Sequence, residues 1–326
     1  MTMIDENPTG APSYKWVGSR SIRPDGLDKV TGKARFGADL ALPGMLEGAV
    51  ARSPHAHARI VSIDTSAAEA MAGVHAVITA ADLPDLAEAG SKVDDVFMSE
   101  KVLARSKVLW EGHPVAAVAA TSREIARAAV AAIEVVYEPL RHVLTVDEAL
   151  ADDAPILHAA MITRGVDPAP ETASNAASRV VHERGDLDQG FADADVVLER
   201  EYTTKPVHQG YIEPHACVAD AGQDGRADLF VSSQGHFSLR AMTATTLGWA
   251  PSALTVTAAE IGGGFGGKTT IYLEPLAVRL SSKAGRPVRL VMDRGEVFKA
   301  TGPTSGSRMK IKMGVTNDGK MTAAQV

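Results

Sequence analysis

One short segment of the sequence has residue types and a spacing that could hold a nucleotide-like ligand. Residues 262–269 read GGGFGGKT and match the phosphate-loop pattern G-x-x-x-x-G-K-[ST], and three of the glycines also match the dinucleotide pattern G-x-G-x-x-G. Backbone N–H groups of such a loop can cradle phosphate, with Lys268 adding charge and Thr269 offering a magnesium ligand. The segment alone leaves both kinds of loop open.

The elements around this segment must position it. The apolar pattern predicts a strand over residues 254–261 and a helix over residues 269–285, and this order suits a phosphate loop. Two features argue against a nucleotide. Phe265 is a bulky residue among five glycines, and too few residues follow Thr269 for the parallel sheet that either nucleotide fold builds. A tight connection with Phe265 in the core is the alternative without a ligand.

Composition excludes several classes of protein. The chain has 326 residues, 45% of them hydrophobic, and a net charge of −7, which gives no electrostatic reason to expect nucleic acid or an anionic membrane. The one cysteine, Cys217, rules out an internal disulfide and a cysteine-ligated iron–sulfur cluster, and we expect it to be a buried apolar residue. We find neither a signal peptide nor a membrane span in the sequence, so we expect a cytoplasmic protein.

The pattern along the chain predicts an α/β (α+β) fold in two globular parts. Residues 1–19 are polar and aperiodic, which predicts an extended arm. Strands alternate with helices over residues 20–140, and residues 186–326 are richer in strands. Between them, residues 141–185 are acidic and rich in Ala and Pro, which is typical of a long surface connection.

The last residues predict a hairpin. Apolar and polar residues alternate on both sides of Asn317-Asp318-Gly319, a strong turn signal. The second strand has scarcely begun at Val326, and its backbone groups need neighbours. We therefore expect the second part to be incomplete as it stands.

Several motifs in order resemble one known family. The segment GGGFGGK is preceded by VSSQ (residues 231–234), and HQGYIEPHACVA (208–219) and MDRGEVFKATG (292–302) flank them. Together they resemble the molybdopterin-binding large subunit of the xanthine dehydrogenase/aldehyde oxidase family, the molybdenum hydroxylases. The resemblance covers the N-terminal part of that subunit, over about residues 20–326. It implies an a/b hammerhead domain over residues 20–140 and the first part of a molybdenum-cofactor-binding domain over residues 186–326.

The resemblance also implies roles for individual residues. Gly263, Gly264, Gly266 and Gly267, with Phe265 between them, match the loop that approaches the cofactor, where glycines let the backbone come close. Phe265 matches an aromatic residue that walls the substrate pocket.

Gln234 matches the glutamine whose amide hydrogen-bonds an oxygen ligand of the metal, so the metal itself takes no ligand from this chain. Gln234 and Phe265 are the residues implied to act in catalysis.

The same resemblance implies cofactors and partners. The cofactor would be molybdenum–molybdopterin, in the cytosine dinucleotide form in a bacterium. Iron–sulfur clusters and FAD would lie on partner subunits, and a further chain would carry the C-terminal half of the molybdenum domain. The substrate would be an aldehyde, an N-heterocycle or an aromatic compound, and this chain alone would be inactive.

One departure from the family pattern bears on the substrate. Purine-hydroxylating members carry a glutamate after the loop lysine, where this chain has Thr269, which argues against xanthine. His208, Glu213 and His215 lack the regular spacing of metal ligands, as do His55 and His57, so we interpret all five as structural. A phosphate-loop protein and a non-catalytic assembly partner descended from the family stay open as alternatives.

Overall fold

The computed structural model describes residues 14–326, so most of the predicted arm, residues 1–13, lies outside the described residues. The chain divides into two compact units, Met1–Arg35 and Phe36–Val326. The described part of the first unit holds one helix, α1 (Gly26–Val30), which buries no residue. Among residues 14–326, every strand lies in the second unit.

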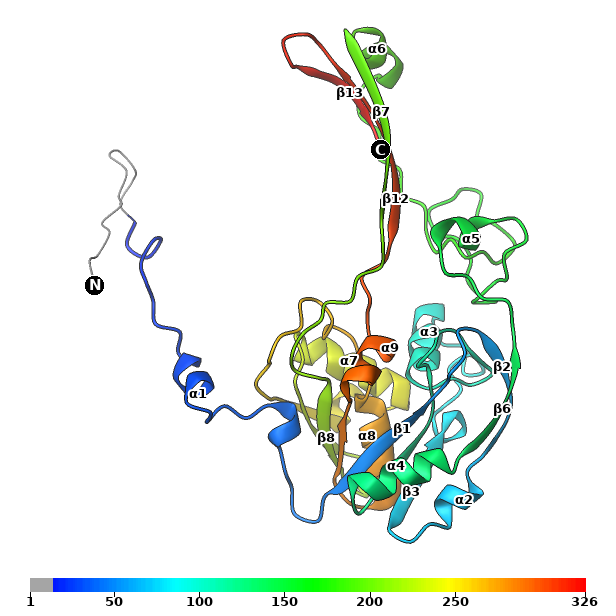
Figure 1. The fold of residues 1–326 in the computed structure, drawn as a ribbon, viewed down its shortest axis with the longest axis vertical. Helices are drawn as coiled ribbons and strands as arrows, with labels where there is room; N and C mark the ends of the chain where they lie inside the picture. Colours follow the sequence, from blue (N-terminus) through cyan, green and yellow to red (C-terminus); the bar gives the residue numbers. More distant parts are fainter. Residues whose placement is uncertain (1–13) are drawn as a thin grey trace. The chain divides into compact units, whose positions relative to one another are not determined.

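Seven strands of the second unit form its main sheet, in the order β10-β9-β8-β11-β1-β5-β3 (Figure 1). The pairs β10–β9 and β11–β1 are parallel, and the others are antiparallel. The sheet is continuous across the two predicted parts, since β1, β3 and β5 come from the first and the rest from the second. The strands are β1 (Leu46–Arg52), β3 (Val74–Thr79), β5 (Pro114–Ala120), β8 (Ala216–Ala221), β9 (Ala227–Val231), β10 (Leu254–Ala258) and β11 (Val288–Val291).

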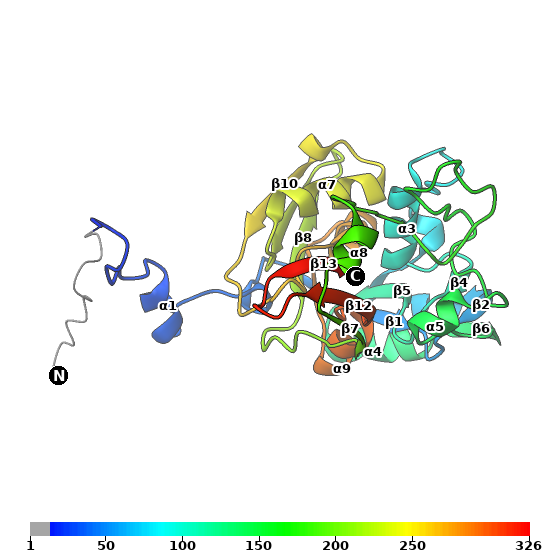
Figure 2. The same cartoon turned by 90° about the horizontal axis from the view of Figure 1, so that it is seen from above.

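Helices pack on both faces of this sheet. They include α4 (Arg123–Ala131), α7 (His236–Leu247) and α8 (Glu274–Ala284). Every residue of β5 is buried, and alternate residues of a strand point to opposite faces. Ala119 belongs to the cluster that contains Leu280 of α8, whereas Val118 packs with Ala129 of α4. The helices α8 and α4 therefore lie on opposite faces, and α7 lies beside β10 (Figure 2).

A small sheet of three strands, in the order β4-β2-β6, completes the N-terminal part. Its strands are β2 (Ala58–Asp64), β4 (Lys107–Val108) and β6 (Glu134–Pro139), and helices α2 (Ser66–Glu69) and α3 (Val93–Val102) lie between them in sequence. Ala58 and Val108 pack with Val115 of β5 in a separate apolar cluster. The segment 141–185 that follows holds one short helix, α5 (Val146–Leu150).

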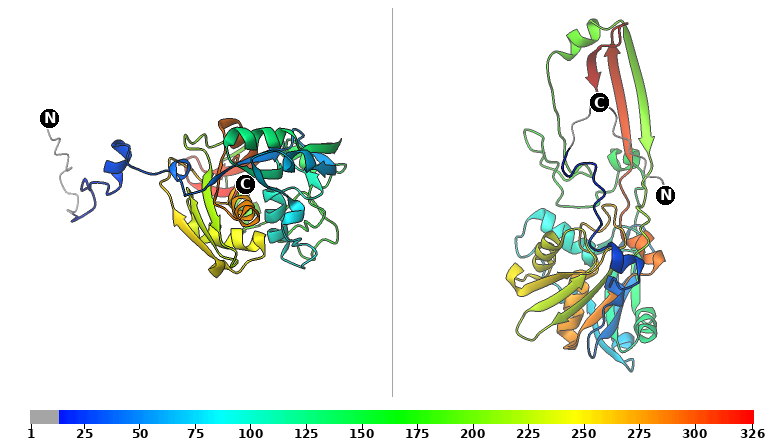
Figure 3. Two further views of the ribbon diagram at one scale, coloured as in Figure 1. Left: turned by 90° about the horizontal axis from the view of Figure 1, so that it is seen from below. Right: turned by 90° about the vertical axis from the view of Figure 1, so that its left-hand side faces the viewer.

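The third sheet consists of three antiparallel strands in the order β13-β12-β7. It comprises β7 (Val196–Thr204), β12 (Ser307–Val315) and β13 (Met321–Gln325), with α6 (Leu187–Ala192) packed against β12 and β13. Figures 1 and 3 show this sheet standing away from the seven-stranded sheet. The predicted hairpin at Asn317-Asp318-Gly319 is confirmed by the β12–β13 pairing. All nine residues of β7 are exposed.

The mixed α/β arrangement confirms the predicted fold class, but some elements differ from the sequence prediction. The helix predicted from residue 269 begins at Glu274, because Pro275 is tolerated in the first turn of a helix but not in its interior. Ile271 and Leu273 are buried in the preceding loop. The sequence pattern also missed β8, α3 and a short helix, α9 (Arg294–Ala300). Strand β8 is buried along almost its whole length, so it lacks the alternation that marks a half-exposed strand.

Candidate functional site

The glycine-rich segment forms a loop between β10 and α8. Phe265 has φ = 50°, the one positive φ of a non-glycine residue among the described residues, and its side chain is 75% exposed. Its neighbours Gly263 and Gly266 have φ values of 100° and 88°, which favour glycine. A Cβ built on Gly266 would meet no atom within 4 Å. The loop therefore turns Phe265 outward and leaves open space in front of Gly266.

Gln234 ties this loop to the segment that follows β9. Its Oε1 accepts hydrogen bonds from the backbone N–H groups of Gly266 (3.0 Å) and Lys268 (3.2 Å), and its own backbone N–H donates to Lys268 O (2.9 Å). A Cβ on Gly264 would lie 2.5 Å from Gln234 Oε1, so this approach requires glycine. The structure thus brings Gln234 and the loop glycines together around Phe265, from segments separated by α7.

Lys268 points into the protein. Its side chain is 1% exposed, and its Nζ lies 2.6 Å from Oε2 of Glu213. The same carboxylate oxygen accepts hydrogen bonds from Ser232 Oγ (2.7 Å) and from the N–H of Gly262 (2.7 Å). Burial lowers the pKa of Lys268, and the hydrogen bond to Glu213 opposes this shift. Glu213 is therefore a hydrogen-bonding structural carboxylate, as we expected. Through Gly262 and Lys268 it holds both ends of the loop against the protein interior.

This geometry does not suit a phosphate loop. The lysine of such a loop must reach the ligand, whereas Lys268 is held by Glu213 on the inner side. The hydroxyl of Thr269 donates to Gly266 O at 2.9 Å, within the loop itself. Because α8 begins only at Glu274, no helix N-terminus follows the Gly-Lys-Thr sequence directly. The expectation of a helix directly after the loop was wrong.

The nearby histidines have structural partners. Nε2 of His215 lies 2.7 Å from the hydroxyl of Tyr211, which also lies 2.8 Å from Thr301 Oγ1, and His208 Nε2 lies 3.0 Å from that same oxygen. Burial lowers the pKa of His215 to about 3, so its ring is neutral at pH 7. Among residues 14–326, no group of three or more His, Cys, Asp or Glu side chains could hold a metal ion. The contacts with Tyr211 and Thr301 support the structural interpretation of His208 and His215.

The remaining residues named from the sequence lie outside the loop region. Nδ1 of His57 lies 2.6 Å from Arg141 O, and the ring of His55 packs edge-on against Tyr137. Cys217 is fully buried in the main apolar cluster, as expected.

Tyr211 is a residue that the sequence analysis missed. Tyr211 is 1% exposed, and its ring packs directly against the backbone of the loop. A Cβ on Gly267 would lie 2.6 Å from Tyr211 Cε1, so glycine is needed for this contact. The Nζ of Lys268 lies 5.2 Å from the centre of the same ring. Its position two residues before Glu213, in the segment HQGYIEPH, was the available signal, because that segment contains most of the polar groups beneath the loop.

Several donors of the loop region have no partner among the described residues. The backbone N–H groups of Gly263, Gly264 and Phe265 donate to no other described residue, and neither does Nε2 of Gln234. Phe265 and Gln234 are exposed, whereas Gly264 is buried against Gln234. These donors are neutral and lie close to an exposed aromatic ring. Neutral N–H donors of this kind fit the oxygen and nitrogen acceptors of a polar cofactor.

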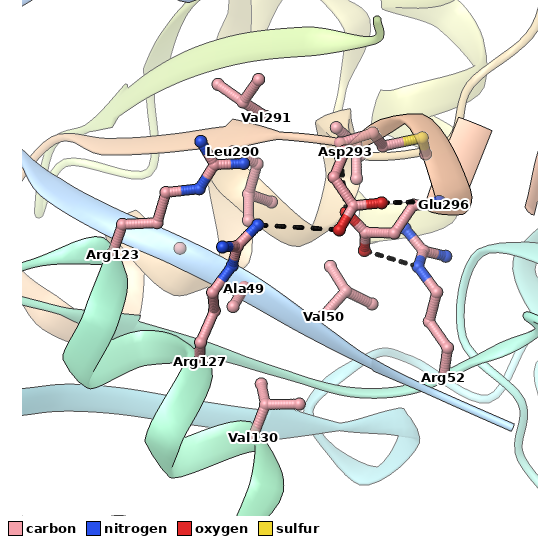
Figure 4. Close-up of a pocket in the computed structure, with 13 residues that line it drawn as sticks. Ala49, Val50, Arg52, Arg123, Arg127, Val130, Leu290, Val291, Asp293 and Glu296 are labelled. Atoms are coloured by element: carbon pink, nitrogen blue, oxygen red, sulfur yellow. Dashed lines mark hydrogen bonds and ion pairs between the residues drawn. The ribbon is translucent and has the colours of Figure 1, made fainter.

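Two cavities lie near these elements. One, of about 280 Å³, lies between α4 and β11 and is lined by arginines whose carboxylate neighbours are already paired: Arg52 with Glu296 at 2.7 Å and Arg127 with Asp293 at 3.6 Å (Figure 4). The other, of about 500 Å³, borders the glycine-rich loop at Gly266. Of these two, the second adjoins the candidate site.

Two family profiles match the chain. The profile described as "Aldehyde oxidase and xanthine dehydrogenase, a/b hammerhead domain" matches residues 31–141. The profile described as "Molybdopterin cofactor-binding domain" matches residues 169–326 and includes both Gln234 and the glycine-rich loop. The two profiles therefore describe an α/β protein with an a/b hammerhead domain followed by a molybdopterin cofactor-binding domain.

Individual relatives and solved structures indicate the same family as the two profiles. The chain is 33% identical to the nicotinate dehydrogenase large molybdopterin subunit of Eubacterium barkeri, over 96% of this chain and 70% of that one. It is 33% identical to a probable xanthine dehydrogenase subunit of Bacillus subtilis, over 94% of this chain and 39% of that one. The structure matches CO dehydrogenase from Oligotropha carboxidovorans with a TM-score of 0.79 and 33% identity, over 94% of this chain and 39% of that one.

The chain belongs to the xanthine dehydrogenase/aldehyde oxidase family of molybdenum hydroxylases. It spans 39% of the length of the Bacillus subtilis relative. Among the described residues, no helix is long and apolar enough to cross a membrane.

Proposed function

We propose that this chain forms part of a molybdenum-cofactor-dependent oxidoreductase that hydroxylates or dehydrogenates an aldehyde, an N-heterocycle or an aromatic compound. The observation that carries the proposal is the arrangement of the glycine-rich loop. The N–H groups of Gly262, Gly266 and Lys268 are bonded to Glu213 and Gln234, while the N–H groups of Gly263 and of the exposed Phe265 have no partner among the described residues. When bound, the molybdopterin supplies Lewis acidity and a redox-active metal.

The residues of this chain would then bind the cofactor and orient the substrate beside it. The N–H groups of Gly263 and Phe265 would donate to the cofactor, and glycine at position 266 would let it approach the backbone. Gly264 is buried, so its role would be to let Gln234 pack closely against the loop. The Nε2 of Gln234 would donate a hydrogen bond to an oxygen ligand of the metal, while its Oε1 keeps the loop in place. Phe265, exposed at the tip of the loop, would form one wall of the substrate pocket.

We further propose partner chains. The chain spans 39% of the Bacillus subtilis relative but 70% of the Eubacterium barkeri relative, so family members differ widely in how much of the molybdopterin subunit one chain contains. The exposed strand β7 offers a surface for further strands or helices. We propose that a complementary chain carries the C-terminal half of the molybdenum domain. Separate subunits would carry the iron–sulfur clusters and FAD, and the cofactor would be the cytosine dinucleotide form.

The substrate proposal follows from the loop and from the relatives. Thr269 follows the loop lysine, in the position of a substrate-binding glutamate in purine-hydroxylating members, so we propose a substrate other than a purine. The names of relatives include nicotinate dehydrogenase and quinoline 2-oxidoreductase, which supports an N-heterocycle among the three proposed classes. The phosphate-loop alternative finds no support, since Lys268 is buried against Glu213.

The variant Gln234→Glu tests the proposal. It keeps an oxygen at Oε1 for the two loop N–H groups, and it replaces the Nε2 donor by a carboxylate oxygen that carries a negative charge. In the complex purified through a tag on this chain, we expect kcat/KM for dye reduction with aldehydes and N-heterocycles to fall roughly a hundredfold, a typical loss for one such donor. Molybdenum content, measured by mass spectrometry, should stay near that of the wild type.

Gln223→Glu is the matched control, because it makes the same charge change at an exposed residue of the turn between β8 and β9. It should leave turnover unchanged. The chain purified alone should give no turnover. A complex without molybdenum, or a Gln234→Glu complex with wild-type turnover, would contradict the proposed function.

A further inference from the structure

The cavity of about 500 Å³ beside the glycine-rich loop has walls from distant parts of the sequence. Lys101 comes from the end of α3, Trp110 from the turn before β5, and Gln209 from the segment before β8. Gly266 and Tyr272 come from the loop before α8. A cavity of this size accommodates a small ring system, and its place on the loop puts it next to the proposed cofactor.

Lys101 brings a positive charge to this cavity, and the charge of opposite sign that acts on it within the chain is the buried carboxylate of Glu274. Its Nζ donates to Thr270 Oγ1 at 3.1 Å and lies 4.2 Å from the centre of the Tyr272 ring. No carboxylate of the described residues lies within 4 Å of it. Burial lowers its pKa to about 8, so the ammonium group is still mostly charged at pH 7. An ammonium group has three donors, and those that remain are available to an anion.

The other lysine of the cavity differs. Lys299 is exposed, and its Nζ lies 2.6 Å from Oε1 of Glu111. The carboxylates of the arginine-lined cavity in Figure 4 are likewise paired within the chain. Lys101 is therefore the charge on the wall of the loop cavity that a bound anion would neutralise.

The aromatic walls of the cavity are held in place by their neighbours. Trp110 stacks on His113 with ring centres 3.7 Å apart and an interplanar angle of 18°. Tyr272 packs edge-on against His215, and its hydroxyl accepts a hydrogen bond from the N–H of Gly302 at 3.3 Å. Rings fixed in this way form a preorganised surface for a planar ligand.

Gln209 adds an acceptor that no described residue satisfies. Its Oε1 is buried and has no hydrogen-bond partner in the structure, while its Nε2 donates to Thr304 Oγ1 at 3.4 Å. A Cβ built on Gly302 would lie 2.8 Å from this oxygen, and one on Gly267 would lie 3.3 Å from it. Buried acceptors are rarely left without a donor, so a ligand N–H or O–H group would complete it.

We propose that this cavity binds a planar N-heteroaromatic carboxylic acid, with Lys101 as the counterion of the carboxylate and Gln209 Oε1 as the acceptor of a ring N–H. The inference rests on the proposed function, of which it narrows the substrate class. It assigns the preference for an acid to Lys101 and the binding of the ring to Trp110 and Tyr272.

Calorimetry on the purified complex tests this with pyrrole-2-carboxylate, which carries a ring N–H, and with its neutral analogue pyrrole-2-carboxamide. The wild type should bind the acid more tightly than the amide. Lys101→Met should weaken acid binding roughly tenfold to a hundredfold, the loss expected for one hydrogen bond to a charged group, and leave amide binding unchanged. Lys101→Arg should retain the preference, and Trp110→Leu should weaken both ligands alike.

Lys107→Met is the matched control. The Nζ of Lys107 lies 3.4 Å from Ile156 O, and Lys107 does not line the cavity, so the change should leave both affinities unchanged. Equal binding of acid and amide by the wild type, no acid binding, or unchanged acid binding in Lys101→Met would overturn the inference.

Molybdenum content and aldehyde turnover of the same complex separate the two proposals. A complex that holds molybdenum and oxidises aldehydes but does not prefer the acid overturns the cavity proposal alone. A complex that binds the acid through Lys101 but holds no molybdenum overturns the proposed function alone.

Discussion

The glycine-rich loop and the β7–β12–β13 sheet differ in where their groups find partners. Beneath the loop, one carboxylate oxygen of Glu213 serves Lys268, Ser232 and Gly262, and the oxygen of Gln234 serves two further N–H groups. In the sheet, all of β7 is exposed, and the apolar residues that it exposes are Val196, Val197, Leu198 and Tyr202. The polar groups beneath the loop thus find partners within the chain, whereas the apolar side chains of β7 are exposed.

The difference extends to ion pairs of the same formal charge. The Lys268–Glu213 pair has side chains that are 1% and 10% exposed. In the sheet, Arg308 pairs with Glu201 and Asp147, and all three side chains are more than a third exposed. Water competes with the second set of contacts and not with the first, so the two pairs should respond very differently to the loss of one partner.

The largest expected effect comes from breaking the buried pair. Glu213→Ala leaves the Lys268 ammonium buried without a partner and should cost about 3–5 kcal/mol in the free energy of unfolding. Chemical denaturation followed by circular dichroism measures this cost. The double variant Glu213→Leu with Lys268→Met removes both charges and should recover part of the stability.

Arg308→Met is the matched change in the β7–β12–β13 sheet and should leave the unfolding midpoint unchanged, since its partners are exposed. Equal losses for Glu213→Ala and Arg308→Met would show that burial does not distinguish the two regions.

A smaller loss in the free energy of unfolding should appear as the pH is lowered. His113 is fully buried; its Nδ1 accepts from Leu109 N–H at 3.2 Å and its Nε2 lies 2.8 Å from Glu100 O, and burial lowers its pKa to about 4. The unfolded chain binds a proton near the ordinary value of 6.5, so stability falls as the pH drops from 6.5 toward 4. At pH 5.5 the loss due to His113 should be about 1 kcal/mol.

Melting curves of the wild type and His113→Gln at pH 7.5 and pH 5.5 check this value. The neutral glutamine cannot titrate, so the acid-induced loss should shrink in the variant. An unchanged loss would mean that His113 is not the group that titrates. The strands of the β7–β12–β13 sheet contain no histidine, so the effect belongs to the seven-stranded body.

The two regions also differ in how far the sequence predicts them. The hairpin at Asn317-Asp318-Gly319 was predictable because an exposed sheet shows clear alternation and a turn signal. The glycine-rich loop was recognisable because positive φ values and the close approach to Gln234 restrict its positions to glycine. Both features are local properties of the backbone, so they leave a local pattern in the sequence.

Partnerships across long sequence separations were not predictable. Lys268 has the spacing of a phosphate-binding lysine. Only its short distance to Glu213, a residue 55 positions earlier, shows that it forms a buried ion pair instead. Likewise, Ile271 and Leu273 have the spacing of helix residues but fill the core from a loop. The loop cavity joins residues from distant segments, and no spacing in the sequence marks it.

The most direct test of the central claim compares two glycines. Gly266 and Gly225, in the turn between β8 and β9, both have positive φ (88° and 76°), and a Cβ on either would meet no atom within 4 Å. Alanine therefore brings the same backbone strain to both, and only at position 266 would it obstruct a bound cofactor. We predict that the purified complex loses most of its molybdenum in Gly266→Ala and keeps it in Gly225→Ala. Equal molybdenum content in the two complexes would contradict the claim that the cofactor lies against this loop.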